Sequence, residues 1–424
     1  MPKRVSAAAL VDSPSELRLH WGAVFASVLG LAFSVAALGF TYSIGSFINP
    51  LMAEFGWSRQ QILAAQPLIT LAVVASSALV GWLADRRGVR TIIIGSQFFF
   101  GLGFFALAIG LHSLSSLYLL YFLLAVAGGG TSSIGFASLL SRRFERQRGL
   151  ALGIAMSGSG LCGFLVPPYA TWAISRFGWR GGYVALGLLP LCIALPLAWR
   201  YLHDDSKASA TPRLASGPAA MPVTELPGAR LGQALADYRF WFMAIGLFSC
   251  SGMLTGMITS LVPLLQERGH TASTAASIAS SFGIAVVLGR VVVGALIDRY
   301  WAPLVGAALL LPAALAVLAL ALAQPGVVGS VCILIIVGIA GGAEVDLMAY
   351  LTSRYFGLRE YGRIFAGLYI AFALGPGVLV PWFGYCRDVY GSYTVALYAA
   401  AGGISLFAVL LLCLGRYPQL SVQR

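Results

Sequence analysis

Residues 81–90 read G-W-L-A-D-R-R-G-V-R, and a shortened copy, G-A-L-I-D-R, occupies residues 294–299. The first glycines of the two copies are 213 positions apart in a chain of 424 residues, which is almost half its length. A second pair of segments, 128–144 and 340–356, repeats at an offset of 212. An apolar chain whose second half repeats its first is typical of membrane transporters built from two helical bundles.

The composition agrees with a membrane protein. Hydrophobic residues make up 59% of the chain and charged residues 10%, whereas a soluble domain carries about 25% charged residues. Segments of roughly 17–25 apolar residues are long enough to span a bilayer. Twelve such segments can be counted, at 21–47, 58–83, 91–111, 116–140, 149–173, 181–200, 239–265, 273–297, 303–323, 327–352, 362–383 and 393–415.

These segments predict an all-α membrane protein with twelve transmembrane helices in two six-helix bundles. The bundles are expected at 21–201 and 238–415. Residues 202–237 are rich in Ala, Ser, Pro and Gly and lack apolar periodicity, so we expect a flexible linker there. The remaining segments, 1–20 and 416–424, are the two tails.

The net charge of +12 is better explained by topology than by nucleic-acid binding. If both termini are cytoplasmic, 21 of the 27 Lys and Arg residues lie on the cytoplasmic side and five on the other. Cytoplasmic loops carry such an excess of positive residues. The sequence therefore predicts a multi-pass protein of the plasma (inner) membrane with both termini in the cytoplasm. One chain supplies a complete twelve-helix unit, so we expect a functional monomer.

Polar residues follow one face of the first predicted helix and of its counterpart in the second half. They are Tyr42, Ser46 and Asn49, and then Ser251, Thr255 and Thr259. A polar stripe on a spanning helix must face protein or water, because lipid satisfies no hydrogen bonds. We predict that Tyr42, Asn49, Ser251 and Thr255 contribute to substrate binding. Hydrogen bonding between helices is the alternative for each Ser and Thr.

Three ionisable residues lie well inside predicted spans: Arg290, Glu344 and Asp346. A charge at mid-membrane costs on the order of 3 kcal/mol, so it usually marks a substrate or proton path. Arg290 is predicted to bind an anionic group, because guanidinium matches carboxylate in a two-point fork. The acids are predicted to carry a proton or to balance Arg290. The two acids are about 200° apart around the helix, and we expect Asp346 to face the cavity or the interface between the halves. The alternative is an ion pair that only fixes helix packing.

The repeated motif has a different predicted role. Its charges lie at the membrane edge, where they can bridge helix ends in one conformation and release them in another. We therefore predict gating roles for Gly81, Asp85, Arg86, Arg87, Gly294, Asp298 and Arg299. None of the four histidines joins a nucleophile or a metal-ligand group, and the six cysteines contain no C-x-x-C. We expect no enzyme activity, no cofactor and no metal.

The doubled motif resembles the loop 2–3 and loop 8–9 signatures of the major facilitator superfamily. Within it, R-R-F-E-R-Q-R-G-L-A-L-G-I-A-M-S-G-S-G (142–160) and G-R-V-V-V-G (289–294) are similar to helix 5 and helix 8 elements of the monocarboxylate porter and oxalate/formate exchanger branch. The resemblance implies that Arg290 takes the role of the arginine linked to the substrate anion. The chain departs from animal monocarboxylate transporters at Tyr42, where they have lysine, and at Val286, where they have aspartate.

The leading hypothesis is a secondary transporter of a small organic anion that works by alternating access, with or without proton coupling. Its partners are then the anion, protons where coupled, and the lipid bilayer, but not nucleic acid. A drug/proton antiporter is the first alternative, although residues 158–168 lack the G-P-x-x-G-G-like motif usual in helix 5 of such antiporters. The second alternative is a membrane receptor that binds a ligand without moving it.

Overall fold

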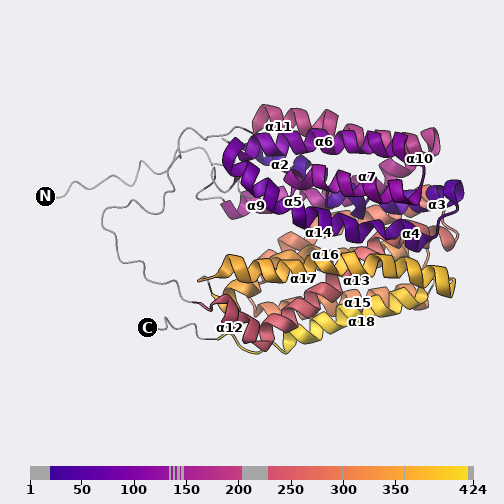
Figure 1. Ribbon diagram of the computed structural model, residues 1–424. Helices are drawn as coiled ribbons and strands as arrows, with labels where there is room; N and C mark the ends of the chain where they lie inside the picture. Colours follow the sequence, from indigo (N-terminus) through magenta and orange to yellow (C-terminus); the bar gives the residue numbers. More distant parts are fainter. Residues whose placement is uncertain are drawn as a thin grey trace, which may run out of the picture.

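The computed structural model describes residues 20–132, 135–136, 139–140, 144, 148–202, 228–297, 299–323, 325–357 and 359–418. These residues form helices joined by short loops (Figure 1). In the first half the elements are α2 (Trp21–Ala32), η2 (Ala37–Thr41), α3 (Ile44–Phe55), α4 (Arg59–Leu63), α5 (Ala65–Arg87), α6 (Val89–Gly110), α7 (Leu114–Ala127), η3 (Gly128–Thr131), α9 (Arg148–Met156), α10 (Gly158–Leu189), η4 (Pro190–Ala194) and α11 (Leu195–Tyr201).

The second half contains seven labelled helices in the described residues. They are α12 (Leu231–Ala236), α13 (Tyr238–Glu267), α14 (Ala272–Ile297), α15 (Ala302–Leu322), α16 (Val327–Phe356), α17 (Tyr361–Tyr390) and α18 (Thr394–Leu412). In Figure 1, α9 and α12 lie at one end of the molecule, which we call the termini end, and α3 and α4 lie at the opposite end, which we call the far end.

Ten helical segments of the described chain are long and apolar enough to cross a membrane. One of them, Gly153–Tyr201, contains two of the predicted spans, because Gly178 with φ 69° interrupts the helix where the chain turns back. α5 adds a further helix of 23 residues, about 34 Å long and sufficient for a crossing. The architecture thus agrees with the twelve predicted spans.

Each half has its own apolar interior. A single core joins buried residues of α12 to α18 and the residues just after α18, and two further cores fill the first half. Val380 of α17 is an exception, since it packs into a core of the first half. The halves therefore touch through a limited set of helices, chiefly α10 with α14 and α17 with α4 and α5.

The end of the predicted linker is ordered, which corrects the expectation of a flexible segment over 202–237. Gly228 pairs with Gly357 as an isolated antiparallel bridge, and the Ala229 N–H donates to the Phe356 carbonyl at 2.7 Å. The Leu231 N–H donates to Glu360 at 2.8 Å. Glu360 supplies a partner that a compositional argument could not foresee. Residues 203–227 lie outside the described residues.

Candidate functional site

The first transmembrane segment is broken near its middle, and this break positions Tyr42. α2 ends at Ala32, a π-helical turn follows at 37–41, and α3 begins at Ile44. The hydroxyl of Thr131, in η3, accepts the Val35 N–H at 3.0 Å. Irregular backbone at membrane depth is tolerated where a neighbouring side chain satisfies it in this way. Tyr42 follows the π-turn directly and is half-buried.

Three glycines set the packing of α14 against α16, the pair that carries the charged residues. A Cβ at Gly342 would clash with the Val286 carbonyl, and one at Gly289 with the Ile339 carbonyl. A Cβ at Gly338 would lie 2.7 Å from the Phe282 carbonyl. Small residues of this kind allow two helix backbones to approach closely in a membrane. This approach brings the two helix faces that bear Arg290 and Asp346 together.

Arg290 and Asp346 form a loose pair across these helices. Arg290 Nη1 lies 3.9 Å from Asp346 Oδ1, which is longer than the 2.7–2.9 Å of a charge-assisted hydrogen bond. The side chains are 16% and 36% exposed, respectively. Within the described chain, Arg290 Nε is buried without a hydrogen-bond partner. A guanidinium offers five N–H donors, so this arginine has donors available for a ligand.

Glu344 takes the opposite direction from Asp346, as their angular separation on the helix leads one to expect. Glu344 is buried, and its carboxyl faces the Cys250 thiol of α13. Among the described residues its Oε1 has no hydrogen-bond partner. Glu344 is therefore turned towards a helix of its own half, whereas Asp346 lies beside Arg290.

Tyr42 brings the first half to this charged group. Its ring lies 6.5 Å, centroid to centroid, from that of Phe282 on α14, and a Cβ at Gly163 of α10 would lie 2.9 Å from Tyr42 Cε1. Arg290 and Glu344 both lie close enough to act electrostatically on the tyrosine hydroxyl. Residues from α14, α16 and the broken first helix therefore converge at one place.

The other predicted binding residues do not join them in the same way. The Ser251 hydroxyl is buried and donates to the Phe372 carbonyl of α17 at 2.7 Å, which favours the alternative of hydrogen bonding between helices. Thr255 is half-buried, and its carbonyl accepts from the Thr259 hydroxyl at 2.9 Å. Asn49 lies at the far end, where its amide donates to Gln266 Oε1 at 2.6 Å. We therefore leave Ser251 and Asn49 out of the proposed site.

The residues with predicted gating roles that the structure describes lie towards the termini end of α5 and α14. Arg86 and Arg87 are exposed in the last turn of α5, and Arg299 is exposed just after α14. Gly294 is in α14 with open space where a Cβ would stand. Gly81 and Asp85 belong to α5, but the surroundings of both residues, like the whole of Asp298, are outside what the structure describes. Their gating roles stay predictions.

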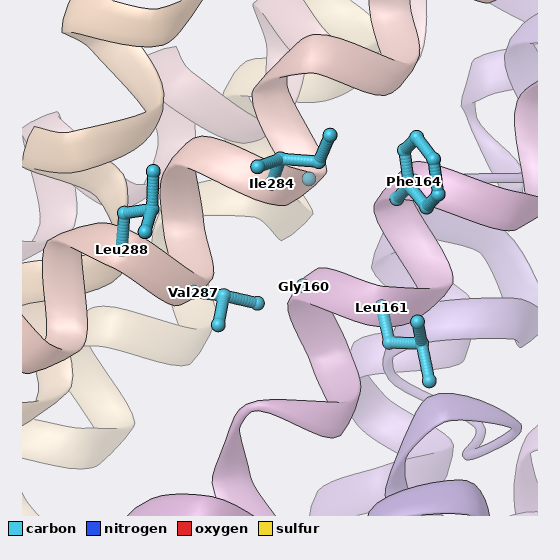
Figure 2. Close-up of a pocket in the computed structure, with 7 residues that line it drawn as sticks. Gly160, Leu161, Phe164, Ile284, Val287 and Leu288 are labelled. Atoms are coloured by element: carbon cyan, nitrogen blue, oxygen red, sulfur yellow. The ribbon is translucent and has the colours of Figure 1, made fainter.

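A groove of about 200 Å³ lies where α10 of the first half crosses α14 of the second, and Figure 2 shows the residues that line it. Gly160, Leu161 and Phe164 line one side, and Ile284, Val287 and Leu288 line the other together with Gly283. This groove is apolar, so it offers no partner to a carboxylate. The close approach of Gly160 and Gly283, whose added Cβ atoms would lie 2.7 and 2.5 Å from the other helix's carbonyl oxygens, makes it the crossing point of the two halves.

Comparison with known proteins identifies the family. The family model described as "Major Facilitator Superfamily" matches residues 29–378. The chain belongs to the major facilitator superfamily. Proteins with similar sequences include monocarboxylate transporter 13 of Bos taurus, 28% identical over 88% of this chain and 84% of its own. They also include the gallate transporter of Pseudomonas putida, 27% identical over 84% of this chain and 86% of its own.

Monocarboxylate transporter 11 of Mus musculus is 31% identical to this chain. The match covers 67% of this chain and 61% of the mouse protein. Among solved structures, the D-xylose-proton symporter has a TM-score of 0.70 at 13% identity, covering 95% of this chain and 99% of its own. A bacterial homolog of the human lysosomal transporter Spinster, inward-facing and unoccupied, has 0.66 at 17% identity, covering 95% and 96%. These structures confirm the fold alone.

The superfamily predicted from the doubled motif is thus confirmed, and relatives named monocarboxylate transporters match the predicted branch. The chain is a membrane-embedded, multi-pass transporter and not an enzyme. Sequence reasoning missed Thr131 and Phe282. The G-x-x-x-G spacing of Gly338 and Gly342 was a readable signal for the α14–α16 contact, but no local pattern links Thr131 to Val35.

Proposed function

We propose that this protein is a secondary transporter of a small organic anion, a monocarboxylate or a similar carboxylic acid, that works by alternating access. Arg290 is the anchor for the substrate carboxylate. The observation that carries the proposal is the state of this arginine. It is largely buried, its only ion pair among the described residues is 3.9 Å long, and its Nε has no partner. An arginine held so loosely has room for a two-point bond with an incoming carboxylate.

Asp346 is proposed as the counter-charge that substrate replaces. In the empty carrier Arg290 and Asp346 balance each other. A bound monoanion adds one negative charge to this pair, and a net charge inside the membrane is costly. Protonation of Asp346 restores neutrality, so anion and proton cross together as a symport. Glu344, buried beside Cys250, is the second proton-carrying group in this proposal.

Residue 286 adds support from this chain's own packing. Val286 is buried, and its carbonyl faces Gly342 of α16. The position where animal monocarboxylate transporters have an aspartate is therefore apolar here, while Asp346 approaches the same arginine from the neighbouring helix. In this proposal the acid that pairs with the arginine lies on α16 in this chain, at Asp346, and not on α14 at position 286. Tyr42 contacts substrate from the first half, and Thr255 from the second.

The relatives support the substrate class. Two are named monocarboxylate transporters and one a gallate transporter, and gallate is itself an aromatic carboxylate. We propose that the bundles 21–201 and 238–415 of one chain rock about the α10–α14 crossing. We also propose that the carrier works as a monomer in the plasma (inner) membrane. The termini end faces the cytoplasm, as the excess of positive residues in that end's loops favours.

The test uses purified protein in liposomes and labelled lactate, oxalate and benzoate, with and without an inward proton gradient. Wild type is compared with Arg290→Ala and with Arg180→Ala, whose arginine pairs with Glu54 away from the site. We expect uptake of at least one acid, lost in Arg290→Ala and kept in Arg180→Ala. Gradient dependence then assigns symport. Uptake that survives Arg290→Ala contradicts the anchor, and no uptake of any acid moves weight to export of cationic drugs.

A further inference from the structure

The far ends of the two halves are joined by charged side chains that substrate binding does not use. Arg59, the first residue of α4, donates Nη2 to Glu267 Oε1 at 2.7 Å. Arg387 of α17 donates Nε to both oxygens of the same carboxylate at 2.8 Å. Glu267 is the last residue of α13. One acid of the second half therefore serves an arginine from each half.

Neighbouring contacts cross the same interface. Asn49 bonds Gln266, as described above, and the Gln60 N–H donates to Asp388 Oδ2 at 2.9 Å. The backbones touch here as well, because a Cβ at Gly384 would lie 2.8 Å from both the nitrogen and the Cα of Gln60. The interface at the far end is closed by polar side chains and by direct backbone contact.

This cluster is better shielded from water than an ordinary surface ion pair. The side chains of Arg59, Glu267 and Arg387 are 11%, 26% and 24% exposed. Glu54 and Arg180, an ion pair at the same end but within the first half, are each 48% exposed and 3.3 Å apart. Less exposed charges are less screened by solvent and salt. The Glu267 contacts should therefore contribute more than the Glu54 contact.

The loop after α17 adds a cover. The buried hydroxyl of Tyr393 faces Ser260, close enough to interact electrostatically with Arg59, Glu267 and Arg387. Burial raises the pKa of Tyr393, so this phenol stays neutral at ordinary pH. Tyr393 therefore places a neutral side chain near the three charged groups.

We propose that these residues form a latch that holds the carrier closed at its far end, with Glu267 as its central residue. The far-end latch comprises Asn49, Arg59, Gln60, Gln266, Glu267, Arg387 and Asp388. Opening requires Arg59 to leave Glu267. Both groups keep a partner when this happens, since Glu267 stays with Arg387 in its own half and Arg59 has Asn49 Oδ1 at 3.4 Å in its own. The latch is therefore reversible, because neither Arg59 nor Glu267 loses its last partner.

The latch rests on the proposed alternating access, and its test needs no substrate. Hydrogen–deuterium exchange would be measured for the peptide that contains the Gln60 amide, in protein reconstituted in lipid nanodiscs. Wild type is compared with Glu267→Gln and with the matched control Glu54→Gln. We expect exchange at Gln60 to rise about tenfold in Glu267→Gln, as loss of a charge-assisted hydrogen bond allows, and to stay at the wild-type rate in Glu54→Gln.

Arg59→Gln provides an independent check should Glu267→Gln fold poorly. Arg59→Gln should raise the exchange rate at Gln60 in the same way. The double variant should show little further rise, because both substitutions remove the same Arg59–Glu267 contact. Wild-type exchange in both single variants, or an equal rise in Glu54→Gln, would overturn the latch. Because uptake of acids is assayed separately, a carrier without acid transport could still show the latch, and the two proposals can fail independently.

Discussion

Two arginine–carboxylate contacts in this molecule differ in a way that separates binding from closure. At the far end, Arg59 and Arg387 bond Glu267 at 2.7 and 2.8 Å. In the centre, Arg290 is 3.9 Å from Asp346. Arg59 and Arg290 each have a buried Nε without a hydrogen-bond partner among the described residues, so the two contacts differ in length and not in that donor. The far-end contact is short, as expected for a closed interface, and the central contact is long, as expected where a ligand must enter. The distance between the charged atoms, and not only the presence of an ion pair, therefore distinguishes a closing contact from a binding site.

The largest expected effect comes from removing the central arginine. Arg290→Ala should lower acid uptake by about 100-fold, because a substrate carboxylate loses two charge-assisted hydrogen bonds. Arg290→Lys keeps the charge but not the fork, so its loss should be intermediate. The measurement is the initial rate in liposomes at equal protein content. Wild-type uptake by the Lys variant would show that the fork is not used.

Neutralising the central acid should change coupling more than binding. Asp346→Asn removes the proposed proton carrier beside Arg290, so uptake should no longer respond to a proton gradient, while exchange of labelled for unlabelled acid continues. Asp237→Asn, at the start of α13, is the control with a carboxylate outside the membrane interior. If a proton gradient still stimulates uptake by Asp346→Asn, Asp346 is not the proton carrier. Glu344 would then be the candidate, and Glu344→Gln would be the variant to measure.

The glycine contact that positions the central pair should be sensitive to one methyl group. Gly342→Ala places a Cβ against the Val286 carbonyl, and overpacking of this kind costs about 1–3 kcal/mol. Gly402→Ala on α18 meets nothing within 4 Å and serves as the control. We expect a lower thermal unfolding midpoint and reduced uptake in Gly342→Ala alone. A wild-type midpoint there would mean that α16 shifts easily, and that the pair is not fixed by this contact.

The smallest effect is expected at Ser251. Its hydroxyl donates to the Phe372 carbonyl, so Ser251→Ala should reduce stability by about 1 kcal/mol and leave the KM for substrate unchanged. Thr255→Val, on the same helix but half-buried, should raise the KM if Thr255 contacts substrate. A raised KM in Ser251→Ala as well would return that serine to the binding site.

The fold could be predicted from the sequence, because the length of each apolar segment indicates a membrane span and the repeated motif indicates the two halves. It also singled out Arg290 and Asp346, since a charge within an apolar segment needs a reason. It could not place Asn49 or Ser251, because helical periodicity gives a face of a helix but not the neighbour that covers it. The far-end latch could not be predicted from the sequence for a similar reason. Arg59, Glu267 and Arg387 lie at helix ends, where charged residues are ordinary, and only the tertiary structure brings them together.

The bond between Val35 and Thr131 has a consequence for biosynthesis. Its two residues are 96 positions apart, so the amide emerges from the ribosome well before its acceptor. Until η3 has been made and inserted, the Val35 N–H must be satisfied by water or by a straight first helix. The bend that positions Tyr42 is therefore completed only after the fourth span arrives. A chain truncated before Thr131 should contain a first span without its final shape.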